Sequence, residues 1–433
     1  MKRNIAMKWG LVALAVAGAF AAPAAMADVT LSGAINMGPA SGRSKDGAAA
    51  GPTNDVTGVN PAQPQGTTGS FLHSTYSHVD IESVDDIGNG NKVVFHYQFD
   101  FSGTSGALSQ TNNIRNRNSF LGVIGDWGAV KWGTNENVYE RFMYQADPLD
   151  GAAGSGGNLN LLGTPGAGQV FESGINGSLP LTCAPTGAPG GRIAAAYTPT
   201  AGCVDFYRRT ENNIWYTSPN WGGIDFEMDY SLPALKSAGA AGNTINPQIL
   251  SIGAKYAPEG MPFSVDVALE WHNDLMGLQL IAGNVNAANA TGSSDTGFQI
   301  GGSYALGDLS LRLRFERLTY ELDGMAAGDV NQYERDAWWV AAKYNLPGGY
   351  VGAEYGKALE ASCERVGTSC DARGTGAQLF SGGYFHDLSK QSQLMFILSI
   401  MRNDEFGTYV NIGSNTGIGQ DGETLYVGLK HTF

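Results

Sequence analysis

Charge is scarce in this 433-residue sequence, and long apolar runs are confined to its first residues. Charged residues make up 15% of the chain, which is less than a water-soluble protein of this size usually carries. Beyond residue 27 no apolar stretch approaches the roughly 18 residues that a membrane-spanning helix requires. The sequence therefore fits neither an ordinary soluble domain nor a helical membrane protein.

Basic residues and the common catalytic motifs are also scarce. The net charge is −14 at pH 7, so nucleic acid is a poor partner. The four cysteines lack a CxxC spacing, and the six histidines form neither HExxH nor an i, i+4 pair, which argues against a metal site. No GxSxG motif and no phosphate-binding loop is present. We therefore expect neither an enzyme nor a bound cofactor.

The first 27 residues have the pattern of a secretory signal peptide. Three basic residues precede a short apolar core, and Ala25, Met26 and Ala27 fit the small-x-small cleavage rule. We expect the mature chain to begin at Asp28 and to form one domain over residues 28–433. Losing the three basic residues changes the net charge from −14 to −17. Export to an oxidising compartment also makes disulfide bonds the default state of the cysteines.

The rest of the chain is rich in glycine (61 residues) and alternates apolar with polar side chains. A period of two predicts strands with one apolar and one polar face. The pattern is clearest over residues 92–101, where Val93, Phe95 and Tyr97 alternate with His96 and Gln98. Sixteen such segments can be counted, at residues 29–37, 70–83, 92–101, 114–124, 129–134, 206–217, 223–231, 248–256, 262–272, 296–306, 309–322, 333–346, 350–359, 377–388, 392–403 and 423–433.

Short and long connections alternate between these segments, and the longest connection covers residues 135–205. An even number of strands joined in this way is the plan of an outer-membrane barrel, whose closure leaves no unpaired sheet edge in the lipid. A terminal edge strand of a soluble sandwich is the alternative for the last segment. A Greek-key sandwich would not keep this alternation, so we predict an all-β, 16-stranded antiparallel transmembrane barrel.

Five blocks in order carry a family resemblance. They read DIGNGNKVVF (86–95), RNSFLGVIGDWGAVKWG (117–133), RTENNIWYTSPNWG (209–222), HDLSKQS (386–392) and VGLKHTF (427–433). They resemble the general porins of Gram-negative bacteria, in particular the betaproteobacterial trimeric type. The resemblance implies a homotrimer, a third loop (135–205) folded into the lumen, and a last residue, Phe433, that the barrel-assembly machinery recognises.

The resemblance also implies acidic loop residues facing a ladder of wall arginines. Arg117 and Arg209 occupy ladder positions, whereas His78 and Thr134 stand where the family has arginines. Strand parity turns eight acidic residues toward the lumen, namely Asp80, Glu82, Asp100, Asp225, Glu227, Asp229, Asp266 and Glu270. The candidate residues of the pore constriction are Arg115, Arg117, Lys131, Asp147, Asp150, Arg209, Arg312 and Arg314.

We therefore expect an outer-membrane channel, in contact with lipid, through which small hydrophilic solutes and ions diffuse passively with a weak preference for cations. A substrate-specific channel and a barrel with a plugged lumen are the alternatives. The cysteines form two local pairs in sequence, from which we expect the disulfides Cys183–Cys203 and Cys363–Cys370.

Overall fold

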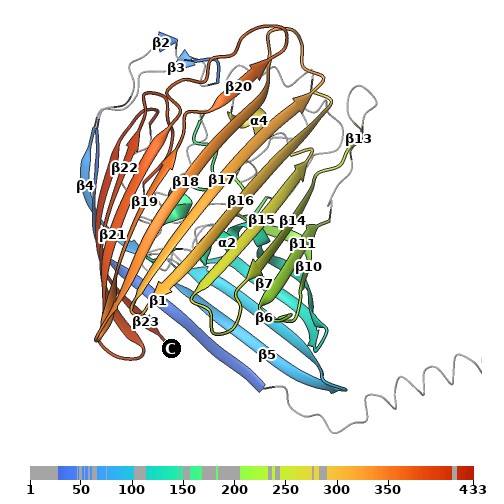
Figure 1. Ribbon diagram of the computed structural model, residues 1–433, viewed down its shortest axis with the longest axis vertical. Coiled ribbons are helices and arrows are strands. Elements are labelled where there is room, and N and C mark those ends of the chain that lie inside the picture. Colours follow the sequence, from blue (N-terminus) through green and yellow to red (C-terminus); the bar gives the residue numbers. More distant parts are fainter. Residues whose placement is uncertain are drawn as a thin grey trace, which may run out of the picture.

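Among the described residues, sixteen antiparallel strands close into a tilted barrel (Figure 1). The computed structural model describes residues 28–45, 47, 51–52, 54–56, 59–60, 66–74, 76–101, 114–145, 147–149, 157–167, 182–183, 205–232, 237–238, 244–275, 277–281, 290–411 and 417–433. The signal peptide predicted at residues 1–27 lies outside these ranges.

Two of the sixteen wall strands are each interrupted once. The second consists of β4 (Thr68–Ser74) and β5 (His78–Gly88), and the thirteenth of β19 (Gly349–Ala358) and β20 (Ser362–Arg365). The other wall strands are β1 (Asp28–Ser44), β6 (Asn91–Phe101), β7 (Ile114–Gly125), β8 (Gly128–Glu136), β10 (Arg209–Thr217), β11 (Ile224–Ser231), β14 (Gln248–Tyr256), β15 (Phe263–Asn273), β16 (Gly292–Leu306), β17 (Leu309–Asp323), β18 (Val330–Leu346), β21 (Ala377–Asp387), β22 (Ser392–Asn403) and β23 (Gly422–Thr432).

The remaining elements are short. The described elements outside the wall are the strands β2 (Gly51–Pro52), β3 (Val59–Asn60), β9 (Thr182–Cys183), β12 (Ser237–Ala238) and β13 (Thr244–Ile245), and the helices α2 (Val138–Tyr144), α4 (Gly277–Ile281) and η1 (Asn158–Asn160). Within the described ranges, no helix has the length and apolar character needed to cross a membrane.

The barrel closes where the first strand meets the last. In Figure 1 the blue β1 lies beside the red β23, and the two pair antiparallel from Ala34↔Thr432 onward. At the end of this seam the backbones of Gly33 and Phe433 exchange two hydrogen bonds of 3.1 Å each. The other edge of β1 pairs with β4 and β5. Closure therefore satisfies the backbone groups that hydrocarbon could not solvate.

The two faces of the wall differ as the alternation predicts. On β17 the apolar Leu311 and Leu313 are 41% and 60% exposed on the outer face. Beyond them, Arg314 and Glu316 point inward and are buried by their neighbours. Exposed aromatic residues, such as Trp127 and Trp221 in turns, add to this outer surface, as expected where a barrel meets the membrane interface.

The predicted strand boundaries agree with the structure for β14 and β22 and lie within one residue of it for β6, β7, β11, β15, β17, β21 and β23. Larger differences have local reasons. The first strand extends beyond the predicted residues 29–37 to Ser44, because residues 37–44 pair with both β4 and β23. The predicted start of the sixth strand at residue 206 is wrong. The Phe206 N–H donates to Gly163 O, and Arg208 O accepts from Asn137 N–H, so these residues belong to the inner loop.

Strand parity predicts that a charge introduced on the outer face destabilises the barrel much more than one introduced on the inner face. Ile300, midway along β16, is 42% exposed on the outer face. An Ile300→Arg substitution should lower the free energy of unfolding by about 2–4 kcal/mol near the midplane. Urea unfolding of the lipid-embedded barrel measures this loss. Glu82→Arg, on the half-exposed inward face of β5, is the control, and an equal loss in both variants would contradict the assignment of faces.

Candidate pore constriction

In the segment between β8 and β10, helix α2 and residues 158–165 contact inward-facing residues of the wall. Helix α2 begins this segment (Figure 1). Its N-cap is Asn137, whose Oδ1 accepts a 2.7 Å hydrogen bond from Glu140 N–H. The N–H groups of Val138 and Tyr139, which have no partner within the helix, donate to Asp229 and Ser251 on the inner wall. Wall side chains therefore complete the first turn of a helix that is too short to be stable alone.

Inward-facing glycines make room for apolar side chains of the loop. A Cβ added at Gly253 would lie 2.7 Å from Val138, one at Gly297 would lie 2.5 Å from Phe206, and one at Gly356 would lie 2.6 Å from Leu161. Each glycine thus admits a loop side chain to the backbone of the wall. The position of the loop is consequently set by three strands, β14, β16 and β19.

A buried arginine holds the middle of the loop. The guanidinium of Arg335 on β18 forms a 2.7 Å ion pair with Glu316 and donates to the carbonyls of Leu161 and Thr164. Glu316 also accepts from the Gly163 N–H. Both members of the ion pair are fully buried. Arg335 and Glu316 therefore each need the other to compensate a charge that water cannot reach.

The two ends of the loop are joined to each other and to β15. Asn137 Nδ2 donates to Phe206 O at 3.0 Å. The ring of Phe206 stacks on His272, with centroids 4.2 Å apart. Arg208 lies 3.8 Å from Glu270, and both are fully buried. The loop therefore leaves and re-enters the wall at one fixed place.

The two predicted ladder arginines meet at one carboxylate. Arg209 forms an ion pair with Glu136, and Arg117 lies 3.5 Å from the same carboxylate and 3.1 Å from Asp100. Glu140 on α2 is 2% exposed beside this group. Burial, followed by the nearby Glu136 carboxylate, raises the pKa of Glu140 to about 7. The arginines are therefore brought together, and their charge is largely compensated.

Lys131 occupies an aromatic site on the inner wall. Its ammonium lies 4.9 Å from the ring centroids of both Phe120 and Trp215. Arg141 of α2 lies over the same Trp215 ring at 5.6 Å and forms a 2.6 Å ion pair with Glu227. The rings hold both cations in place through cation–π attraction. The sequence did not single out these inward-facing aromatic residues.

The other candidate residues are spread over the barrel. Arg314 pairs with Asp266 at 2.7 Å, and Arg312 is half-buried two residues before it on the same face. Asp147 is 6% exposed and its Oδ1 accepts from Leu149 N–H. Asp150 and the side chain of Arg115 lie outside the described residues.

Histidines and carboxylates share the inner face of β5 and β6. Asp80 lies 3.2 Å from His78 Nε2 and 3.5 Å from His96 Nε2, while Glu82 lies 2.8 Å from His96 Nδ1. Gln98 donates to Asp80 at 2.7 Å. His78, at a position where an arginine was expected from the resemblance, thus belongs to a patch rich in negative charge.

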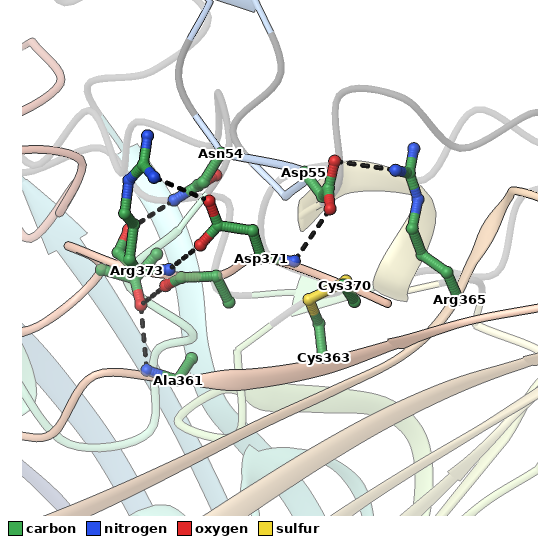
Figure 2. Close-up of a disulfide and its surroundings, with 10 residues drawn as sticks. Asn54, Asp55, Ala361, Cys363, Arg365, Cys370, Asp371 and Arg373 are labelled. Carbon is green, nitrogen blue, oxygen red and sulfur yellow. Dashed lines mark hydrogen bonds and ion pairs between the residues drawn. A yellow bond between two sulfur atoms is a disulfide. The ribbon is translucent and has the colours of Figure 1, made fainter. Parts of the chain in front are cut away.

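A disulfide closes a loop that begins in β20, the short strand paired with β18 (Figure 2). The predicted disulfide Cys363–Cys370 is present, whereas Cys183–Cys203 lies outside the residues whose side chains are described. Asp55, from the connection between β1 and β4, pairs with Arg365 at 2.8 Å and accepts from Asp371 N–H at 2.8 Å. The disulfide loop therefore anchors a second loop across several strands.

These features define a class of protein: a closed transmembrane barrel with an apolar outer face, a charged inner face and a loop helix that contacts the inner face. The model of the Gram-negative porin family matches residues 13–405, and the chain belongs to that family.

Individual relatives agree with this assignment. An outer membrane porin of Bordetella pertussis is 22% identical over 474 residues, covering 99% of this chain and all of the relative. The major outer membrane protein P.IA of Neisseria meningitidis is 25% identical over 236 residues, or 51% of this chain and 56% of the relative.

Solved structures share the fold. An anion-selective porin from Comamonas acidovorans superposes with a TM-score of 0.62 at 19% identity, over 94% of this chain and 100% of that chain. The outer membrane protein OmpT of Vibrio cholerae gives 0.57 at 11% identity, over 95% and 99%. The protein is thus an outer-membrane porin, a channel for passive diffusion of small solutes, and not an enzyme.

Burial predicts very different costs for two similar ion pairs. Arg335→Gln leaves Glu316 buried without its partner and should cost about 3–5 kcal/mol of stability. The control is Arg373→Gln, because the Arg373–Asp371 pair at 3.2 Å lies in an exposed loop, and such pairs contribute about 0–1 kcal/mol. Heat-modifiable gel migration and proteolysis of the loop would measure both. Equal sensitivity would show that Arg335 does not hold the loop.

Proposed function

We propose that this porin is a general diffusion channel with a weak preference for cations. The main support is that arginines of the inner wall form ion pairs with carboxylates, which compensate their positive charge. Arg117 and Arg209 share Glu136, and Arg314 pairs with Asp266. Compensated charges act only at short range in a pore. The basic ladder therefore contributes less to selectivity than its number of arginines suggests.

The patch on β5 and β6 supports the sign of this preference. Asp80 and Glu82 interact with imidazole and amide groups rather than with arginine or lysine in the contacts described above. Glu82 is also half-exposed. Carboxylates facing water in the lumen attract cations. The Comamonas acidovorans porin is described as anion-selective. We propose the opposite preference for this chain, whose His78 and Thr134 stand where the family resemblance implies arginines.

The reversal potential across a KCl gradient tests the preference. We expect a potential of the sign given by K⁺, and a shift toward Cl⁻ in Asp80→Asn with Glu82→Gln, because two negative charges leave the lumen wall. Asp147→Asn with Asp150→Asn tests whether the loop carboxylates contribute. Asp387→Asn at a short turn serves as a control without effect.

A wild-type potential that favours Cl⁻ would contradict the proposed sign. Block by one solute at low concentration, with otherwise small currents, would instead support a substrate-specific channel.

We further propose that the mature chain begins at Asp28, assembles as a homotrimer in outer-membrane lipid and carries a second disulfide, Cys183–Cys203. Mass mapping of the exported protein tests the start and the disulfide. Migration at about three times the monomer mass before heating tests the trimer.

The terminal aromatic residue is proposed as a signal for the barrel-assembly machinery. Support comes from the seam, where Phe433 exchanges backbone hydrogen bonds with Gly33. Deleting Phe433 removes these bonds and the aromatic end, so we expect much less folded barrel in the outer membrane. Quantitative blotting of heat-modifiable protein measures this. Phe433→Tyr, which keeps the backbone and an aromatic ring, is the control, and normal levels of the truncated chain would refute the proposal.

A further inference from the structure

The second wall strand is broken at a place that projects a tyrosine into the lumen. Between β4 and β5, the side chain of Ser77 takes the place of backbone hydrogen bonds to β1. Its Oγ accepts from Asn36 N–H at 3.0 Å and donates to Asn36 O at 3.2 Å. Tyr76, the residue before it, has a φ of 51°. A left-handed conformation is uncommon for a residue with a side chain and costs about 1–3 kcal/mol.

The ring of Tyr76 contacts the loop helix rather than the wall alone. It lies edge-on to Tyr144 in the last turn of α2, with centroids 5.9 Å apart and an interplanar angle of 89°. On its other side, the guanidinium of Arg117 lies 4.9 Å from the ring centroid. An edge-to-face pair and a cation–π contact each favour this placement.

Helix α2 contacts two parts of the wall with different faces. On one face, Val138 and Phe142 fit against Gly253 on β14. On the other, Tyr144 meets Tyr76, which precedes β5. Five wall strands separate β5 from β14 around the barrel, namely β6, β7, β8, β10 and β11. The contact between the two tyrosines therefore joins the loop helix to a second part of the wall.

We infer that the Tyr76–Tyr144 contact closes the gap between the loop helix and the wall, and that it sets the upper size of the solutes that pass. The inference rests on the diffusion-channel function and adds the residues that determine its size limit. Uncharged solutes are the class most affected, because two aromatic rings exclude by volume and do not discriminate by charge. Removing the Tyr76 ring would also free Arg117 from its cation–π contact.

Single-channel conductance and liposome swelling test this together. Tyr76→Ala and Tyr144→Ala should each raise conductance by at least about 1.5-fold, because each widens the narrowest section. Swelling with uncharged sugars of increasing size should show a larger cut-off. The double variant should raise both conductance and cut-off further than either single variant, because each ring occupies part of the passage.

Two controls separate this role from general damage. Tyr76→Phe keeps the ring contact and should conduct as the wild type does. Tyr97→Ala removes a tyrosine from the outer face of β6 and should change neither conductance nor cut-off. If the wild type conducts and its alanine variants keep the same conductance and cut-off, the inference is wrong while the channel function stands. A wild type that does not conduct would contradict the channel function itself.

Discussion

The structure depends on one constraint, which is that backbone groups in hydrocarbon must be paired within the protein. The chain meets it by pairing β1 with β23, so that the sixteen described wall strands form a closed ring. Closure requires both ends of the chain to meet, which explains why β1 is the longest of the early strands and pairs on both edges. It also creates an interior that must be filled or constricted by segments that hydrocarbon does not touch.

The interior is organised by compensating charge rather than by an apolar core alone. Arg335 with Glu316 and Arg209 with Glu136 lie among buried residues. A buried ion pair adds little net stability over an apolar pair, but breaking it is costly. Such pairs therefore fix the loop in one arrangement. The same pairing reduces the field that a passing ion meets, so stability and selectivity depend on the same side chains.

The wall could be predicted from sequence because its side chains alternate, and alternation is a local property. The faces of Asp229, Glu270 and Arg314 follow from it. The pairing of Arg335 with Glu316 could not be predicted, since parity gives the face of a residue but not the register that places it beside a residue of the neighbouring strand. The break at Tyr76 was also missed, because its cause is the hydrogen bonding of Ser77 to Asn36, a residue 41 positions away. Helix α2 was missed because wall residues on other strands complete its first turn.

The glycines of the inner wall have a consequence for the order of assembly. The loop between β8 and β10 docks on β14, β16 and β19, which follow it in the sequence. Tyr139 contacts Ser251 and Glu316, 112 and 177 residues later, and Leu161 contacts Arg335, 174 residues later. The loop therefore cannot take up its final position until strands that follow it in the sequence have formed the wall against which it packs.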